Sequence, residues 1–273
     1  MNVRETAAPG DEVVRRWRRA ADGAVLLDGF HAIKHALRFD ARLLAGVTSD
    51  LPSVLALAGQ LAPDTSESLA ALLVEVTPEA LRTLVPRPHP TSVAALAARP
   101  DRATHLAELA HTPRTAPIVL LDQPRNLGNA GAVIRLAAGF GVTGVITTGP
   151  LDPWHPTVVR GGAGLHFATA VERLDQHEEE YADGGVVGAG LPEGPLLALD
   201  ADGEDIRGLR IPDDAVLAFG SERSGLSPAV RARADRLISL PMRPQVSSYN
   251  LATSVAMALF HWSTAAGRPT PTA

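Results

Sequence analysis

The chain has 273 residues, of which 45% are hydrophobic and 20% charged, a composition typical of globular proteins and sufficient for two modest domains. It contains no cysteine, which excludes disulfides, zinc–thiolate sites and cysteine nucleophiles. The N-terminal segment MNVRETAAPGDEVVRRWRRA carries charges where a signal peptide needs an apolar stretch, and no run of about 18 apolar residues occurs. We therefore expect a soluble, cytoplasmic protein with no membrane partner.

The formal net charge of −5 argues against a uniformly basic surface of the kind that binds nucleic acid phosphates. The charges are unevenly spread, however, because acids gather in residues 172–183 and 199–205. Four arginines lie close together near the N-terminus: Arg15, Arg16, Arg18 and Arg19. This cluster is consistent with a solvated terminal helix or with a local basic face.

The first part of the chain, residues 22–98, alternates short apolar runs with helical patterns. We predict strands at residues 24–29, 41–49, 72–76 and 91–97. We predict helices at residues 30–39, 52–61 and 78–84. Residues 1–100 are therefore expected to form a small α/β domain.

A polar stretch follows, and we assign residues 101–115 as a linker and residues 116–268 as a second domain. In that domain the expected strands are 118–123, 144–149, 184–190, 214–220 and 236–241, and the expected helices are 131–141 and 247–266. Strands that alternate with helices predict a mainly parallel sheet covered on both faces. The last residues, GRPTPTA, have a composition typical of disorder.

The first polar cluster of the second domain follows a predicted strand that ends at Asp122. The chain then crosses a Pro/Asn/Gly turn and enters a helix near Asn129, whose free backbone N–H groups would attract anions. Arg135 lies in that helix among apolar neighbours and needs a carboxylate or phosphate partner, which an interdomain salt bridge would also supply. The glycine spacing does not match G-x-G-x-x-G, so a dinucleotide fold is not indicated.

Two further clusters also follow apolar strands. The segment LAFGSERSGLSP places Glu222 in a loop of small residues, which is neither a nucleophile elbow nor a P-loop and could be a plain tight turn. The segment LISLPMRPQVSSYN leads through a proline-containing loop to Ser247, Ser248 and Asn250 at the start of a helix, where they could be simple caps. Each cluster taken alone is a weak signal.

Their order and spacing together resemble the SpoU (TrmH-type) family of RNA 2′-O-ribose methyltransferases of the SPOUT class. The resemblance rests on Asn129 and Arg135 in GNAGAVIR, on GSERSG, and on the proline–methionine loop that leads to Ser-x-Asn in LPMRPQVSSYN. The N-terminal half, especially LLDGFHAIKHAL, is similar to the ribosomal-protein-like α/β domain with which family members bind RNA. The motifs that carry the resemblance to the methyltransferases span residues 117–265.

The resemblance implies a C-terminal α/β-knot domain, a SPOUT trefoil knot, preceded by a smaller α/β RNA-binding domain. It implies S-adenosylmethionine as cofactor, no metal, and a homodimer in which the arginine of one subunit approaches the cofactor of the other. The implied cofactor-binding positions are Gly220, Leu240, Met242, Tyr249 and Leu251. The implied catalytic positions are Arg135, Asn129, Glu222, Ser248 and Asn250.

We expect Arg135 to hold a phosphate and to stabilise the developing alkoxide, because a guanidinium with a pKa above about 12 is a poor base. Ser248 and Asn250 would order their loop, and Glu222 would fix it to the adjacent helix. The chain departs from the family pattern at Pro244, where glycine is usual, and at Tyr249, where leucine is usual. We therefore expect a slightly different course of the cofactor loop.

The substrate is expected to be RNA, with large-subunit (23S) ribosomal RNA first, because an accessory domain is commoner in the family's ribosomal RNA enzymes. The alternatives are a tRNA 2′-O-methyltransferase, an RNA-binding module that has lost catalysis, and a nucleotide-binding oxidoreductase. His31 and His35 are spaced to share one face of a helix and could ligate a metal. The sequence offers no third ligand beside them, so we expect a role in packing or RNA contact.

Overall fold

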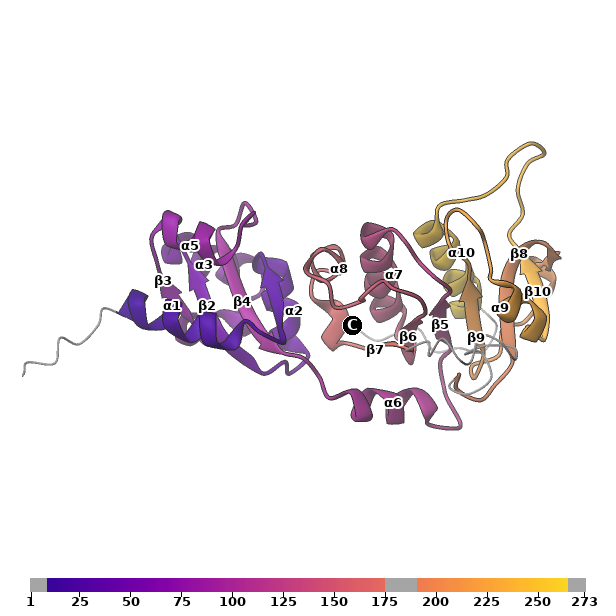
Figure 1. The fold of residues 1–273 in the computed structure, drawn as a ribbon, viewed down its shortest axis with the longest axis horizontal. Coiled ribbons are helices and arrows are strands. Elements are labelled where there is room, and N and C mark those ends of the chain that lie inside the picture. The colour runs from indigo at the N-terminus through magenta and orange to yellow at the C-terminus, as the bar shows by residue number, and fades with distance from the viewer. Residues whose placement is uncertain (1–8, 175–190, 265–273) are drawn as a thin grey trace, which may run out of the picture. The chain divides into compact units, whose positions relative to one another are not determined.

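The computed structural model describes residues 9–174 and 191–264 (Figure 1). Backbone contacts divide the described chain into two compact units. One unit comprises the residues up to Pro100 together with Ala163–Ala168, and the other runs from Asp101 onward without that short segment. Within the described ranges, no helix combines the length and the hydropathy that a bilayer span requires.

The first unit is a four-stranded mixed sheet with helices packed on it. Its strands are β1 (Ala24–Asp28), β2 (Leu43–Thr48), β3 (Leu73–Glu75) and β4 (Val93–Ala98), in the order β1-β4-β2-β3. Its helices are α1 (Pro9–Ala20), α2 (Phe30–Arg38), α3 (Leu51–Leu61), α4 (Ser66–Leu72) and α5 (Pro78–Leu84), with 3-10 turns at Pro63–Thr65 and Leu165–Phe167. Strand β4 runs antiparallel to both β1 and β2, whereas β2 and β3 are parallel.

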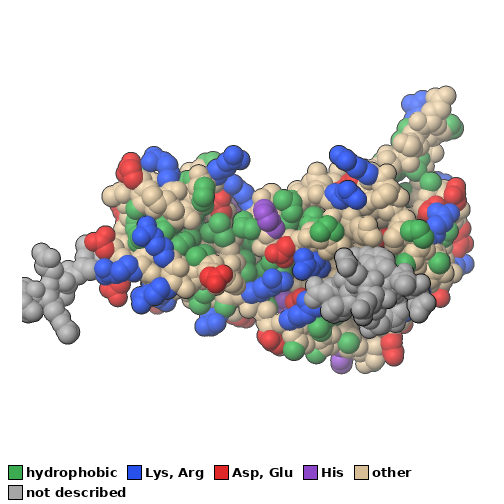
Figure 2. Space-filling view, viewed as in Figure 1, with side chains coloured by type: hydrophobic (Ala, Val, Ile, Leu, Met, Phe, Trp, Pro, Cys, Tyr) green, Lys and Arg blue, Asp and Glu red, His purple; other side chains and the backbone are tan. Residues whose placement is uncertain are grey.

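Helix α1 has one apolar and one basic side. Val13 and Trp17 are buried in the core of this unit, beside residues of β2 and β4. The arginines of α1 are all exposed: Arg15, Arg16, Arg18 and Arg19. Lys and Arg side chains gather over the segment that Figure 1 labels α1 (Figure 2). The helix is therefore anchored by its apolar residues and presents its guanidinium groups to solvent.

The second unit is a six-stranded sheet in which every strand pairing is parallel. The strands, in the order β10-β8-β9-β5-β6-β7, are β5 (Ile118–Leu121), β6 (Gly144–Thr147), β7 (Ala170–Arg173), β8 (Leu196–Asp205), β9 (Val216–Phe219) and β10 (Arg236–Ser239). The helices are α6 (Arg102–Ala110), α7 (Leu127–Phe140), α8 (Pro156–Gly161), α9 (Pro228–Arg233) and α10 (Leu251–Ser263), with a 3-10 turn at Ile206–Gly208. The prediction of an α/β fold with a mainly parallel sheet is confirmed.

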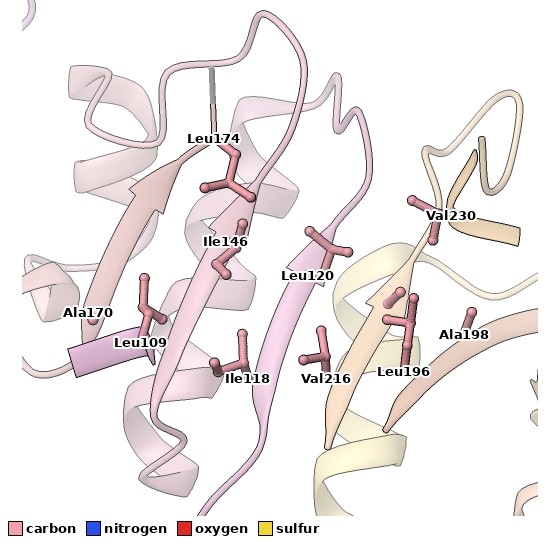
Figure 3. Close-up of a cluster of buried hydrophobic side chains, with 11 residues drawn as sticks. Leu109, Ile118, Leu120, Ile146, Ala170, Leu174, Leu196, Ala198, Val216 and Val230 are labelled. Atoms are coloured by element: carbon pink, nitrogen blue, oxygen red, sulfur yellow. The ribbon is translucent and has the colours of Figure 1, made fainter. Parts of the chain in front are cut away.

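The core of this unit follows from the near-continuous apolar runs of its strands, which parallel strands covered on both faces require. On one face, side chains from five adjacent strands form a cluster with Leu109 of α6 and Val230 of α9 (Figure 3). The helices coloured as α7 and α10 lie behind the strands in the same view, and α7 and α10 pack against each other. Helices thus cover both faces, and the strand ends remain available for loops.

The stretch expected as a linker holds helix α6 and belongs to the second unit. Asp101 caps this helix by accepting a hydrogen bond of 2.9 Å from the Thr104 backbone N–H. His105 and Leu109, one helical turn apart, are buried, and α6 packs against β7. Packing of this buried face against β7 stabilises the short helix.

Strands β7 and β8 were not predicted. β7 (AVER) ends in two charged residues, and β8 contains Asp and Gly residues that strands usually disfavour. In β8 these acids are paired with arginines: Asp200 with Arg231, and Glu204 with Arg236. The strand predicted at residues 184–190 and the last segment GRPTPTA lie outside the described residues.

The candidate site lies where strands of this sheet separate at their carboxyl ends. β8 pairs with β9 only from Leu196 to Leu199, which faces Phe219 at the end of β9. The loops after β5, β9 and β10 then carry the three polar clusters identified in the sequence. Ligands of parallel α/β sheets bind at such positions. The trefoil knot of this region stays a prediction.

Candidate functional site

A cavity of about 550 Å³ lies at the carboxyl ends of β9 and β10, beside the middle of β8, and extends to the start of α10. Its size is within the range of about 300–1,000 Å³ that is usual for small-molecule sites. It is lined by Leu199, Asp200, Ala201, Phe219, Gly220, Ser221, Glu222, Gly225, Leu226, Ile238, Leu240, Met242, Ser247, Ser248, Tyr249, Asn250, Leu251 and Ser254. All five sequence-predicted cofactor positions are among these residues.

The loop after β9 folds tightly back on itself. The backbone groups of Ser221 and Gly225 exchange two hydrogen bonds of 2.9 and 3.0 Å, and their neighbour Ser224 is 2.7 Å from Ser221 between hydroxyl oxygens. A Cβ atom at Gly220 would lie 2.1 Å from the carbonyl carbon of Gly225, so only glycine fits there. The turn holds Glu222 at the cavity wall.

Asp122 anchors this loop to the sheet. The carboxylate follows β5, is almost completely buried, and accepts hydrogen bonds from the Thr148 hydroxyl at 3.0 Å and the Ser227 backbone N–H at 2.6 Å. Thr148 follows β6, and Ser227 lies after the turn that carries Glu222. Because a buried carboxylate needs several donors, its bonds fix three neighbouring loops together.

Three of the predicted catalytic side chains form a continuous hydrogen-bond chain. The Asn129 side-chain amide donates to Glu222 Oε1 at 2.9 Å, and the Asn250 amide donates to Asn129 Oδ1 at 3.1 Å. Asn250 Oδ1 in turn accepts from the Ala252 backbone N–H at 2.9 Å. A carboxylate only accepts hydrogen bonds, so Glu222 sets the orientation of both amides. The chain joins the first turn of α7, the loop after β9 and the N-cap of α10.

Glu222 is held in its ionised form. Its partial burial raises the pKa, but hydrogen bonds from the Asn129 amide and from backbone N–H groups outweigh this effect. One of those donors is the Arg125 N–H, 3.3 Å from Glu222 Oε2. The pKa of Glu222 therefore lies below the ordinary value for a glutamate.

The helix caps differ slightly from expectation. Helix α7 is capped by Asn126, whose side chain accepts from the Asn129 N–H at 3.0 Å, whereas we expected Asn129 at the helix start. The Asn129 side chain is therefore available for Glu222. Helix α10 is capped by Asn250, and Ser248 lines the cavity.

The loop between β10 and α10 contains a type II turn. Its hydrogen bond joins the Val246 N–H to the Arg243 carbonyl at 3.2 Å, and Gln245 has a φ of +72°. Pro244 occupies the position where this turn type favours proline, so the departure from the family pattern has a local structural role. The Tyr249 hydroxyl donates to the Pro241 carbonyl at 2.9 Å, which ties the two ends of the loop together.

Arg135 is placed differently from the other predicted site residues. It is exposed on α7, does not line the cavity, and has no hydrogen-bond or ion-pair partner within residues 9–174 and 191–264. The described part of the chain therefore does not contain the interdomain salt bridge that could have paired Arg135. Asn129 also lies outside the cavity lining, but it is joined to it through Glu222 and Asn250.

Sequence reasoning missed one wall of the cavity, formed by Leu199, Asp200 and Ala201 of β8. The acidic pattern in this segment concealed a strand. The apolar run LLAL immediately before Asp200 is the signal that could have identified it.

The two histidines that could be metal ligands, His31 and His35, lie in α2. Their ring centroids are 6.5 Å apart, and His35 Nδ1 is 2.8 Å from the Ala163 carbonyl, within the first unit. Over the described ranges, no group of three His, Cys, Asp or Glu residues is close enough to hold a metal ion.

The fold is shared with solved structures over nearly the whole chain. The SpoU methyltransferase AviRb from Streptomyces viridochromogenes, bound to AdoMet, matches with a TM-score of 0.69 and 24% identity over 91% of this chain and 96% of that chain. An RNA 2′-O ribose methyltransferase matches with a TM-score of 0.68 and 27% identity over 94% and 96% of the two chains. The structure is therefore of the SPOUT methyltransferase fold class.

The sequence profile of the SpoU rRNA Methylase family matches residues 116–260, which is more than half of the chain. The chain belongs to this family. A 23S rRNA (uridine(2479)-2′-O)-methyltransferase of Streptomyces viridochromogenes is 32% identical over 146 residues, 52% of this chain and 50% of the relative. An uncharacterized tRNA/rRNA methyltransferase of Mycolicibacterium gilvum is 32% identical over 148 residues, 53% and 45% of the two chains. The chain spans about half the length of these curated relatives.

Proposed function

We propose that this protein transfers a methyl group from S-adenosylmethionine to a ribose 2′-hydroxyl of RNA. The observation that carries the proposal is the hydrogen-bond chain from Glu222 through Asn129 to Asn250 at the edge of the cavity. It brings together residues of α7, of the loop after β9 and of the N-cap of α10 that match the family's polar positions.

The cavity suits a cationic cofactor. Two of its lining side chains are carboxylates, Asp200 and Glu222, and no Lys, Arg or His is among the lining residues that the structure describes. A dinucleotide would place a pyrophosphate in its site, which needs cationic or backbone donors. S-adenosylmethionine instead carries a sulfonium and an ammonium group. Apolar residues such as Leu240, Met242 and Leu251 would hold its adenine ring, and Gly220 lets the backbone approach closely.

S-adenosylmethionine supplies an electrophilic methyl group, so that the S–CH3 bond breaks as the bond to the ribose 2′-oxygen forms. The protein must orient the hydroxyl and stabilise the negative charge on its oxygen as the proton leaves to phosphate or water. Arg135 would bind a phosphate of the RNA and stabilise this charge. Ser248, Asn250 and Glu222 would hold the loops around the reacting groups.

The exposed position of Arg135 supports a role that needs a second molecule. Because Arg135 does not line the cavity of its own chain, a homodimer would let it reach the cavity of the partner. Phe260 of α10 is 62% exposed, which is unusual for so large an apolar side chain and fits a subunit contact.

Free cationic groups support RNA as the substrate. The arginines of α1 have no ion-pair partner in the described part of the chain, and Arg125, Arg223 and Arg243 are exposed in the loops that carry the site. Large-subunit ribosomal RNA is favoured because a relative that is 32% identical over half its length acts on 23S rRNA at a uridine 2′-oxygen. A tRNA substrate is the alternative.

Isothermal titration calorimetry of the purified protein tests the cofactor. We expect binding of S-adenosylmethionine and no binding of NAD. Binding of NAD alone would favour an oxidoreductase and contradict the proposal. Transfer of a labelled methyl group to ribosomal RNA in the same preparation separates an enzyme from a binding module, because a module without catalysis would bind RNA and leave it unlabelled.

A further inference from the structure

Asp200 lies on the cavity wall that the sequence did not reveal. It follows Leu199, the last residue of β8 that pairs with β9, and it lines the cavity. Its side chain is only 13% exposed. A carboxylate that is so little hydrated needs partners to remain charged.

Asp200 shares its one arginine partner in the described chain with a second carboxylate. Its Oδ1 accepts a hydrogen bond of 3.0 Å from the Asp202 backbone N–H, and its Oδ2 pairs with the Arg231 guanidinium. Arg231 also pairs with the Asp202 carboxylate at 3.3 Å. One guanidinium thus serves two carboxylates, and this group retains a net charge of −1. Arg231 is not among the lining residues, so the carboxylate of Asp200 is the charged group of the three that borders the cavity.

The other lining carboxylate, Glu222, is already engaged by Asn129 and by the Arg125 N–H. Among the described residues no cationic side chain lines the cavity, and Arg231, which pairs with Asp200, is not one of its lining residues. We propose that Asp200 binds a positively charged group of S-adenosylmethionine, its ammonium or its sulfonium. This inference rests on the proposed function and adds a cofactor-binding residue to it.

Calorimetric dissociation constants for three ligands test the inference in wild-type protein and Asp200→Asn. The ligands are S-adenosylmethionine, S-adenosylhomocysteine, which lacks the sulfonium, and 5′-methylthioadenosine, which lacks the sulfonium and the ammonium together with the carboxylate. Asn keeps the shape of the side chain and its acceptor oxygen. We expect S-adenosylmethionine to bind about tenfold more weakly to the variant, the effect of losing one charged hydrogen bond, and methylthioadenosine to bind equally to both proteins. An equal loss for S-adenosylhomocysteine identifies the ammonium as the partner, and an unchanged affinity for it identifies the sulfonium.

Two further variants separate a direct contact from a structural effect. Asp202→Asn removes a carboxylate from the same guanidinium outside the cavity, and Arg231→Gln breaks the ion pair while leaving Asp200 in place. Arg231→Gln should bind S-adenosylmethionine at least as tightly as the wild type. Asp202→Asn, whose lost carboxylate does not border the cavity, should weaken binding less than Asp200→Asn does. The inference is overturned if Arg231→Gln weakens binding as much as Asp200→Asn, if methylthioadenosine is weakened equally, or if Asp200→Asn changes no affinity. A wild-type protein that binds no S-adenosylmethionine would instead contradict the proposed function itself.

Discussion

Glu222 is the charged member of the hydrogen-bond chain at the site, and its contribution depends on pH. Its pKa in the folded protein is lowered, so its ionisation stabilises the fold above the pKa of an unfolded glutamate, about 4.3. That contribution is lost as the pH falls through the folded pKa. We therefore expect Glu222→Gln to be less stable than wild type at neutral pH, and the difference to shrink progressively below about pH 4.3. Urea unfolding at a series of pH values measures both curves, and a pH-independent difference would contradict this role.

Arg135 is the predicted site residue that lies exposed outside the cavity. Because it is exposed and makes no contact that the described structure depends on, Arg135→Ala should fold normally and bind S-adenosylmethionine as the wild type does. We expect its kcat for methyl transfer to fall about 10²- to 10³-fold, the usual effect of removing one donor to a developing oxyanion. Single-turnover kinetics measure the chemical step. Retention of full kcat would show that another group stabilises the 2′-oxygen.

The tight turn after β9 requires a glycine at position 220. Gly220→Ala places a methyl group against the backbone of Gly225 and should destabilise the protein by about 1–3 kcal/mol, with loss of cofactor affinity. Gly139→Ala is a matched control, because its added Cβ on α7 meets no atom within 4 Å and alanine favours helix. Thermal unfolding with and without S-adenosylmethionine measures the stability and the cofactor binding of both variants. Equal behaviour of the two variants would mean that the tight turn is not required.

We predict that the four exposed arginines of helix α1 bind RNA phosphates. Gln at all four arginine positions should weaken binding to ribosomal RNA and reduce the slope of log K against log[salt] by about 0.7–0.9 for each phosphate that the helix no longer neutralises. Lys at the same positions should preserve the slope, because it preserves the charge. Filter binding over a range of salt concentrations measures the slope. If the Gln variant has the wild-type slope, the arginine face is merely solvated.

Much of both sheets could be predicted from the sequence, because most strands are apolar runs bounded by turn residues, as in β5 and β9. β8 was missed because its acids need partners that are distant in the chain, namely Arg231 and Arg236. Helix α6 was missed because its stability comes from packing on β7 and not from its composition.

Only part of the candidate site could be predicted from the sequence. The order of the three clusters indicated which loops matter, and the structure brings Glu222, Asn129 and Asn250 into contact. Periodicity could not indicate the exposure of Arg135, since an apolar helix with one arginine looks the same whether that arginine faces solvent or a partner. The cavity wall at Asp200 depended on a strand that was itself missed.

For the whole molecule, the net charge of −5 conceals two different distributions. Along β8 the acids bind arginines, and the guanidinium of Arg207 lowers the pKa of Asp205 to about 2. The arginines of α1 and of the site loops have no such partners in the described ranges. An acidic chain can therefore still present free guanidinium groups to a polyanion, because arginines that are already paired contribute little to its capture.

The proposed activity is the methylation of ribose 2′-oxygens of RNA. Mass-spectrometric mapping of ribose methylation tests it, using ribosomal RNA and tRNA from cells that carry the gene, lack it, or carry Arg135→Ala. We expect a 2′-O-methyl group at a defined nucleotide, favoured in large-subunit ribosomal RNA, to disappear in the deletion, to return with the wild-type gene and to remain absent with Arg135→Ala. An unchanged methylation map in the deletion would contradict the claim.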